Sequence, residues 1–103
     1  MVFDMPYGSI AQDAMDGKRV AVFCDSQAQA ERCKRRIADA AQDIGAVKVV
    51  CPRRDRRVVI DGNHVHIFLT GGDGRGYSAD VVYLSVLARM QYEWAALMGG
   101  EVK

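Results

Sequence analysis

Two groups of basic side chains are the residues of this sequence best suited to bind a ligand. One group lies in a stretch with helical periodicity, and the other lies in a turn after the next apolar stretch. An arginine guanidinium is always charged and can bind phosphate through two parallel hydrogen bonds. The candidates are Arg32, Lys34, Arg35 and Arg36 in the helical stretch and Arg53, Arg54, Arg56 and Arg57 in the turn. They predict a nucleic-acid-binding surface for DNA or RNA.

The positive charge of the chain is concentrated around these residues. The net charge is only +1, yet residues 32–57 hold nine of the 14 Lys and Arg residues and three acidic residues. Contact of about six of them with phosphates would give a log-log salt dependence with a slope near roughly −5. The alternative is a solvated surface, because Asp39, Asp43 and Asp55 lie among them and no aromatic residue is present there to stack on bases.

Histidine and cysteine residues offer weaker candidates for chemistry. His64 and His66 alternate on a predicted strand and share a face, which is compatible with a two-histidine metal site. A third ligand at suitable spacing is missing, so ordinary strand histidines are favoured. Cys24, Cys33 and Cys51 lie in apolar surroundings, which favours small core residues over a nucleophile, a disulfide or a zinc site. We therefore expect no enzymatic activity, no metal and no cofactor.

A glycine-rich segment at residues 71–76 contains the last basic candidate, Arg75. Successive backbone amides in such a segment can form an anion-binding nest, to which Arg75 would add charge. The segment precedes a predicted strand instead of a helix, so no helix N-terminus would direct donors at a phosphate. A flexible connection is the favoured interpretation.

Composition indicates one globular domain over residues 1–103, with half of the residues hydrophobic and 26% charged. Asp4, Asp13 and Asp16 interrupt the first 18 residues, which contain neither a basic segment nor a long apolar run. We therefore expect a cytoplasmic protein without membrane association.

Hydrophobic periodicity predicts the elements that position the basic residues. A helix capped by Ser9 runs to Met15 and closes at Gly17, and a second runs from a cap at Asp25 or Ser26 to about Ile44 and closes at Gly45. The predicted strands are 19–24, 47–51, 58–60, 64–69 and 81–84, with residues 61–63 forming a hairpin turn.

This order of elements predicts an α/β three-layer sandwich with a mostly parallel sheet and a β-hairpin near one edge. Strands 19–24 and 47–51 would form a parallel βαβ unit around a central first strand. The start of the long helix and the basic turn would then lie at the carboxyl end of the sheet, where α/β proteins place their ligands.

A final helix after Ser85 carries a second candidate surface. Its apolar stripe consists of Leu87, Met90, Trp94 and Leu97. Such a stripe usually packs in the core, but part of it could form an interface with a second copy or another protein. We expect a homo-oligomer.

Two segments resemble a known family. The run GSIAQDAMDGKRVAVFCDSQAQAERCKRRI and the run IDGNHVHIFLTGGDGRGYSADVVYLS are similar, in the same order, to parts of RecA-like P-loop ATPases, above all phage terminase large subunits and helicases. The resemblance spans residues 8–85. It implies a RecA-like or Rossmann-like core, with the strand before Ser85 at the position that normally ends in a magnesium-binding acid.

The departures from this family concern its catalytic residues. Only Gly8 and Ser9 could remain of the phosphate loop, without its lysine, and Ser85 and Val86 replace the acidic pair. The resemblance, together with these departures, implies a non-catalytic, phage-type accessory protein with a degenerate RecA-like core, and the basic residues predict that it binds nucleic acid or the machinery that processes it. The alternative is a protein-interaction module, a homodimer or an inhibitor of a host or phage partner, that binds no nucleic acid.

Overall fold

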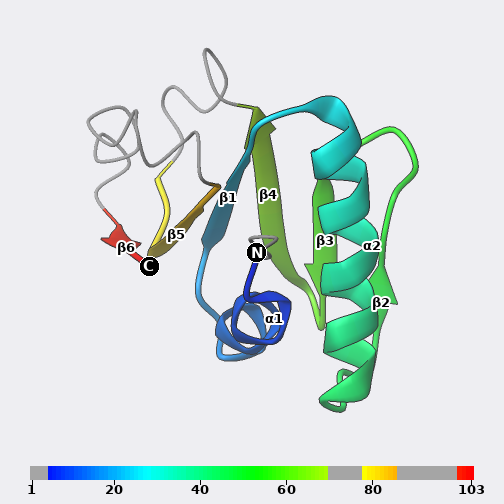
Figure 1. Cartoon of the computed structure of the whole chain (residues 1–103). Helices are drawn as coiled ribbons and strands as arrows, with labels where there is room; N and C mark the ends of the chain where they lie inside the picture. The colour runs from blue at the N-terminus through cyan, green and yellow to red at the C-terminus, as the bar shows by residue number, and fades with distance from the viewer. Residues whose placement is uncertain (1–4, 70–77, 86–99) are drawn as a thin grey trace.

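Within residues 5–69, 78–85 and 100–103, which the computed structural model describes, the chain forms helices and a mixed six-stranded sheet (Figure 1). The predicted α/β class is confirmed. The elements in chain order are α1 (Tyr7–Met15), β1 (Val20–Cys24), α2 (Gln27–Asp43), β2 (Val49–Val50), β3 (Arg57–Ile60), β4 (Asn63–Leu69), β5 (Val81–Leu84) and β6 (Glu101–Val102).

The sheet has the order β2-β3-β4-β1-β5-β6. Strand β1 pairs in parallel with β4 on one side and with β5 on the other, and β5 pairs in parallel with β6. The pairings of β2 with β3 and of β3 with β4 are antiparallel. All five residues of β1 are buried, as expected for a strand covered on both faces. Its predicted central position is confirmed.

The predicted parallel direction of the two strands of the βαβ unit is confirmed, and the two strands are not neighbours in the sheet. Strands β1 and β2 point the same way, but β3 and β4 lie between them. Five of the seven residues of β4 pair with the five residues of β1, from Val20–Val65 to Cys24–Leu69, whereas β2 has only two residues and pairs with β3. The longer apolar strand of the hairpin therefore takes the place beside β1.

Helix α2 begins and ends where its sequence predicts. The Ser26 hydroxyl oxygen accepts a hydrogen bond from the Gln29 amide at 3.2 Å, and Gly45 after the helix has φ +99°. Buried Ala30, Cys33 and Ile37 form the stripe that packs on the sheet. Helix α1 begins at Tyr7 instead of after Ser9, because the Pro6 carbonyl accepts the first helical hydrogen bond, from Ile10 at 3.0 Å.

Both described helices cover the same face of the sheet. The main core cluster joins α1 and α2 to alternate strand residues such as Val22, Ile67 and Tyr83. The opposite face buries a second cluster, which includes Phe23, Val82 and Leu84. The final helix that was expected to form a third layer, with Leu87, Met90, Trp94 and Leu97, lies in residues 86–99, outside the described residues. Neither α1 nor α2 is long and apolar enough to span a bilayer.

The predicted hairpin joins β3 and β4 through a two-residue turn. Asp61 and Gly62 both have positive φ, 49° and 84°, which is the geometry of a type I′ turn. The Asp61 carboxylate also accepts hydrogen bonds from the amides of Val47 and Lys48, at 2.9 and 2.7 Å. The turn is thereby connected to the segment that leads into β2.

Candidate functional site

The N-terminal end of α2 and the basic turn lie at the carboxyl edge of the sheet. Helix α2 follows directly after β1, and residues 51–56 follow β2, which runs in the same direction as β1. Figure 1 shows the loop after β2 beside the upper half of α2. The start of α2 and the turn after β2 therefore lie at the same edge of the sheet, as the sequence predicts.

Lys34 holds the turn against the helix. Its ammonium donates a 2.6 Å hydrogen bond to the Pro52 carbonyl and lies 3.8 Å from the Glu31 carboxylate. The side chain is only 2% exposed. Lys34 is therefore removed from the candidate phosphate-binding residues, because its ammonium is buried and already bound to groups of the protein. Spacing gives the physical reason, since Lys34 falls on the apolar stripe between Ala30 and Ile37.

Arg57 also differs from its expected role. It lies in β3, whose residues Val58 and Ile60 face the helices, so its side chain points to the other face of the sheet. There its guanidinium lies 3.2 Å from the Asp55 carboxylate and 3.4 Å from Nδ1 of His64. Arg57 therefore belongs with the histidines and not with the residues of α2.

The remaining basic candidates form what we call the basic surface. Its members are exposed on α2 or lie in the turn after β2, and Arg56 is half-buried. The Arg36 guanidinium also lies 5.8 Å from the centre of the Tyr7 ring, so α1 supports its position. The basic surface comprises Arg32, Arg35, Arg36, Arg53, Arg54 and Arg56. Arg75 lies in residues 70–77, outside the described residues.

The carboxyl ends of β1 and β5 bring together two polar residues that the sequence did not associate. The chain leaves β1 toward β2 on one side of the sheet and leaves β5 toward β6 on the other, which is the topological switch point of an α/β sheet. Here the buried Ser85 hydroxyl donates a hydrogen bond to the Asp25 carboxylate. Both residues directly follow apolar strands, which is visible in the sequence. Their pairing could have been predicted only with the additional knowledge that β1 and β5 are neighbours.

The segment that the resemblance compares with a phosphate loop is helical in the structure. Gly8 and Ser9 lie in the first turn of α1, so they do not form a loop between a strand and a helix. Ser85, at the position that the resemblance compares with a magnesium-binding acid, donates its hydroxyl hydrogen bond to the Asp25 carboxylate. No cluster of three or more His, Cys, Asp or Glu side chains that could hold a metal occurs within residues 5–69, 78–85 and 100–103.

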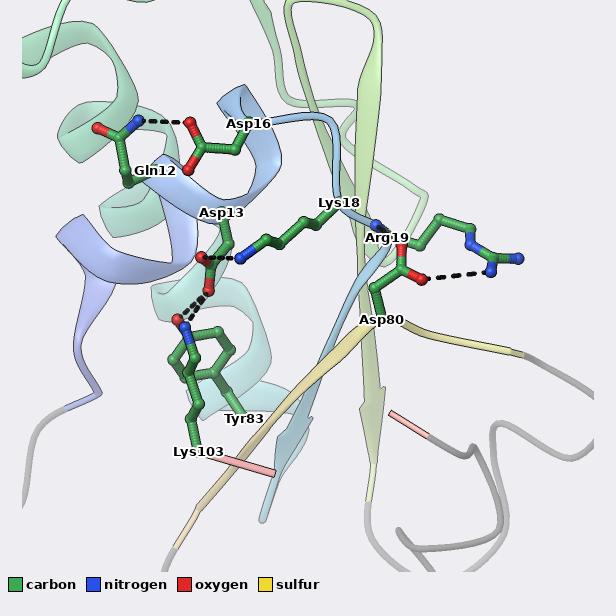
Figure 2. Close-up of polar contacts among 8 residues, drawn as sticks. All are labelled: Gln12, Asp13, Asp16, Lys18, Arg19, Asp80, Tyr83 and Lys103. Atoms are coloured by element: carbon green, nitrogen blue, oxygen red, sulfur yellow. Dashed lines mark hydrogen bonds and ion pairs between the residues drawn. The ribbon is translucent and has the colours of Figure 1, made fainter. Parts of the chain in front are cut away.

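A buried carboxylate, Asp13, connects α1 to β5 and to the residue that follows β6 (Figure 2). Its carboxylate accepts a 2.5 Å hydrogen bond from the Tyr83 hydroxyl and a 3.0 Å hydrogen bond from Lys103, and lies 3.5 Å from the Lys18 ammonium. Burial opposes ionisation of Asp13, but the hydrogen bonds and the lysine charges outweigh it and lower its pKa. Burial and the hydrogen bond to Asp13 raise the pKa of Tyr83. These groups stabilise the fold and lie away from the basic surface.

A scan against protein-family models, a search of curated proteins and a search of solved structures each found no significant match to the chain. The functional assignment therefore depends on the geometry of the chain's own residues.

Proposed function

We propose that this protein is a non-catalytic nucleic-acid-binding accessory protein that contacts phosphate groups through the basic surface. The observation that carries the proposal is the hydrogen bond from buried Lys34 to the Pro52 carbonyl. It fixes the arginine-rich turn beside α2, so that arginines from two separate segments present one positively charged surface. A degenerate RecA-like core of phage type remains part of the proposal, on the resemblance described above.

The composition of the basic surface favours recognition of the nucleic-acid backbone over recognition of bases. Arginine guanidinium groups bind phosphate oxygens in any sequence context, and phosphate contacts position a protein without reading sequence. Within α2 and residues 51–56 there is no aromatic side chain on which a base could stack. We therefore expect binding with little sequence preference and strong dependence on salt.

The test is fluorescence anisotropy with labelled single- and double-stranded DNA and RNA at several salt concentrations. The variant Arg53→Gln/Arg54→Gln removes two exposed cations of the basic surface. Loss of two phosphate contacts should reduce the slope of log K against log salt by roughly 2 for duplex DNA and weaken binding by about tenfold or more at low salt.

The matched control is Arg19→Gln/Lys48→Gln. It removes the same number of exposed cations just before β1 and β2, at the opposite edge of the sheet. This control should keep the native slope. Equal weakening in both variants would indicate a response to net charge alone, and the absence of binding by the native chain at low salt would refute the proposal.

A second candidate function, protein-protein interaction, is favoured by one observation at the edge of the sheet. Ile44, Val47 and Val50 are exposed around the edge strand β2, with Val47 94% exposed. An exposed edge strand can pair with another chain through its backbone. A concentration-dependent increase in mass by light scattering that Val47→Lys abolishes would support a homo-oligomer formed at this edge. A monomer at all concentrations would exclude self-association there.

A further inference from the structure

A hollow of about 280 Å³ lies at the amino edge of the sheet, opposite the basic surface. It is lined by residues 17–19 before β1, by Gly62 and Asn63 of the hairpin, and by His64 and His66 of β4. Its volume is slightly below the range of pockets for drug-sized ligands, about 300–1,000 Å³, and so suits a small molecule.

Two imidazole rings form one wall of this hollow. His64 and His66 share a face of β4, and their ring centroids are 5.7 Å apart with an interplanar angle of 16°. The Arg57 guanidinium approaches the pair from β3, with Nη1 3.4 Å from Nδ1 of His64. Three nitrogen-containing side chains are therefore close together on the face of the sheet that α1 and α2 leave uncovered.

One cation on the other wall has a weakly held partner. The Arg19 guanidinium lies 3.4 Å from the Asp80 carboxylate, and the two side chains are 61% and 46% exposed (Figure 2). An exposed ion pair of this kind contributes about 0–1 kcal/mol, so Arg19 can turn toward an anion with little loss of stability. Lys18 also lines the hollow, but its ammonium lies 3.5 Å from the buried Asp13 carboxylate.

The charges around the imidazole pair are close to balance. Positive groups are Arg57 from β3 and Lys18 and Arg19 before β1, and negative groups are Asp55, Asp13 and Asp80, each paired with one of these cations. Protonation of the imidazoles would leave the hollow with net positive charge. Burial lowers the pKa of His66, and the charges of His64 and Arg57 lower it further. An anion in the hollow would offset this repulsion and stabilise the protonated form.

We propose that this hollow binds a small phosphate-type oxyanion between the imidazoles of His64 and His66 and the guanidinium of Arg19. The ligand is either free inorganic phosphate or a phosphate monoester of a small metabolite, since both present the same tetrahedral group. Because the site lies at the opposite edge from the basic surface, it is independent of nucleic-acid binding.

The first test is a titration with sulfate, followed by NMR of the histidine ring protons. Sulfate keeps its charge between pH 5.5 and 7.5, so any change in affinity reports on the protein. We expect saturable shifts of both rings, with a dissociation constant at least fivefold lower at pH 5.5 than at pH 7.5. Chloride at matched ionic strength should give no saturable shift, and identical responses to sulfate and chloride would overturn the proposal.

Variants assign the site to its residues. Arg19→Gln, a change at an exposed side chain, should weaken sulfate binding at least fivefold, and so should His66→Asn. Lys48→Gln, which removes an exposed cation outside the hollow, should leave the sulfate-induced shifts of both histidine rings unchanged. If Arg19→Gln and His66→Asn both fold, by circular dichroism, and bind sulfate as the native chain does, the hollow is not the site. Tighter binding of ribose 5-phosphate than of inorganic phosphate would identify a monoester as the ligand, and equal binding would identify free phosphate.

Discussion

Asp13 combines burial with ionisation, and its neighbours determine the balance between them. The residue is 6% exposed, yet it accepts hydrogen bonds from Tyr83 and Lys103. A buried carboxylate remains ionised where hydrogen bonds and a neighbouring ammonium stabilise its anionic form. Removing the carboxylate would leave those donors without a partner. Asp13 thus joins α1 to β5 and to the residue after β6.

The change Asp13→Asn should lower the free energy of unfolding by about 2 kcal/mol at pH 7, because the hydrogen bonds from the Tyr83 hydroxyl and the Lys103 ammonium lose their charged acceptor. Urea unfolding followed by circular dichroism measures this. Tyr83→Phe, which removes one of these hydrogen bonds and leaves the carboxylate, should cost about half as much.

The same residue predicts a dependence of stability on pH. The pKa of Asp13 is lowered from its ordinary value of 3.8, so its contribution is fully present above about pH 4 and is lost as the pH falls through the lower pKa of the folded state. The native chain should therefore lose stability below pH 4 more steeply than Asp13→Asn. Parallel curves for the two proteins would contradict the predicted shift.

At the scale of elements, the contact between α2 and the turn after β2 is the feature on which the basic surface depends. The Lys34 side chain is buried at this contact, so it can influence a ligand only through the position of the turn. Its effect on binding can therefore be separated from that of an arginine that touches phosphate.

Lys34→Met keeps the length of the side chain and removes the hydrogen bond to the Pro52 carbonyl. We expect a loss of about 1–2 kcal/mol in the free energy of unfolding, within the range for hydrogen bonds made by charged groups. Nucleic-acid affinity should fall several-fold, while the slope of log K against log salt stays at its native value. A slope reduced by about one unit would instead place Lys34 in contact with phosphate.

The elements with strong local signals were predictable, and those defined by long-range pairing were not. Helix α2 had a capping residue, an apolar stripe and Gly45, and β5 was an uninterrupted apolar run, so their positions follow from neighbouring residues. The two-residue strand β6 has no such pattern and exists because it pairs with β5. The prediction missed it for that reason.

The candidate site was predictable in its location and only in part in its members. Parallel strand direction placed the start of α2 and the basic turn at one edge. The burial of Lys34 follows from helix periodicity, and the direction of the Arg57 side chain follows from strand periodicity. Applying both periodicities to the sequence would have removed these two residues from the candidate phosphate-binding residues. The pairing of Asp25 with Ser85 required the order of the strands, which local patterns do not contain.

At the scale of the whole molecule, the position of β6 against β5 depends on close approach of two backbones. A Cβ atom at Gly100 would lie 2.5 Å from the Ala79 carbonyl oxygen, closer than van der Waals contact allows. Beyond Gly100, the Glu101 amide donates to the Asp80 carbonyl and Lys103 reaches Asp13.

Gly100→Ala should therefore displace β6 and weaken both contacts. Hydrogen exchange should show faster exchange at the amides of residues 101 and 103, while the amides of β1 keep their native protection. We expect a loss of about 1–3 kcal/mol in the free energy of unfolding, the usual range for overpacking. Gly8→Ala is the control, since a Cβ there would meet nothing within 4 Å and alanine favours a helix.

The central position of β1 also has a consequence for the order in which the protein can be made. On a ribosome, residues 20–24 are synthesised long before either neighbouring strand, because β4 ends at Leu69 and β5 at Leu84. Until the first of these emerges, a segment that is apolar on both faces has no backbone partner and is open to pairing with other nascent chains. Translation that stops before Asn63 would therefore release a chain prone to aggregate, and protection of the nascent strand would have to come from a chaperone.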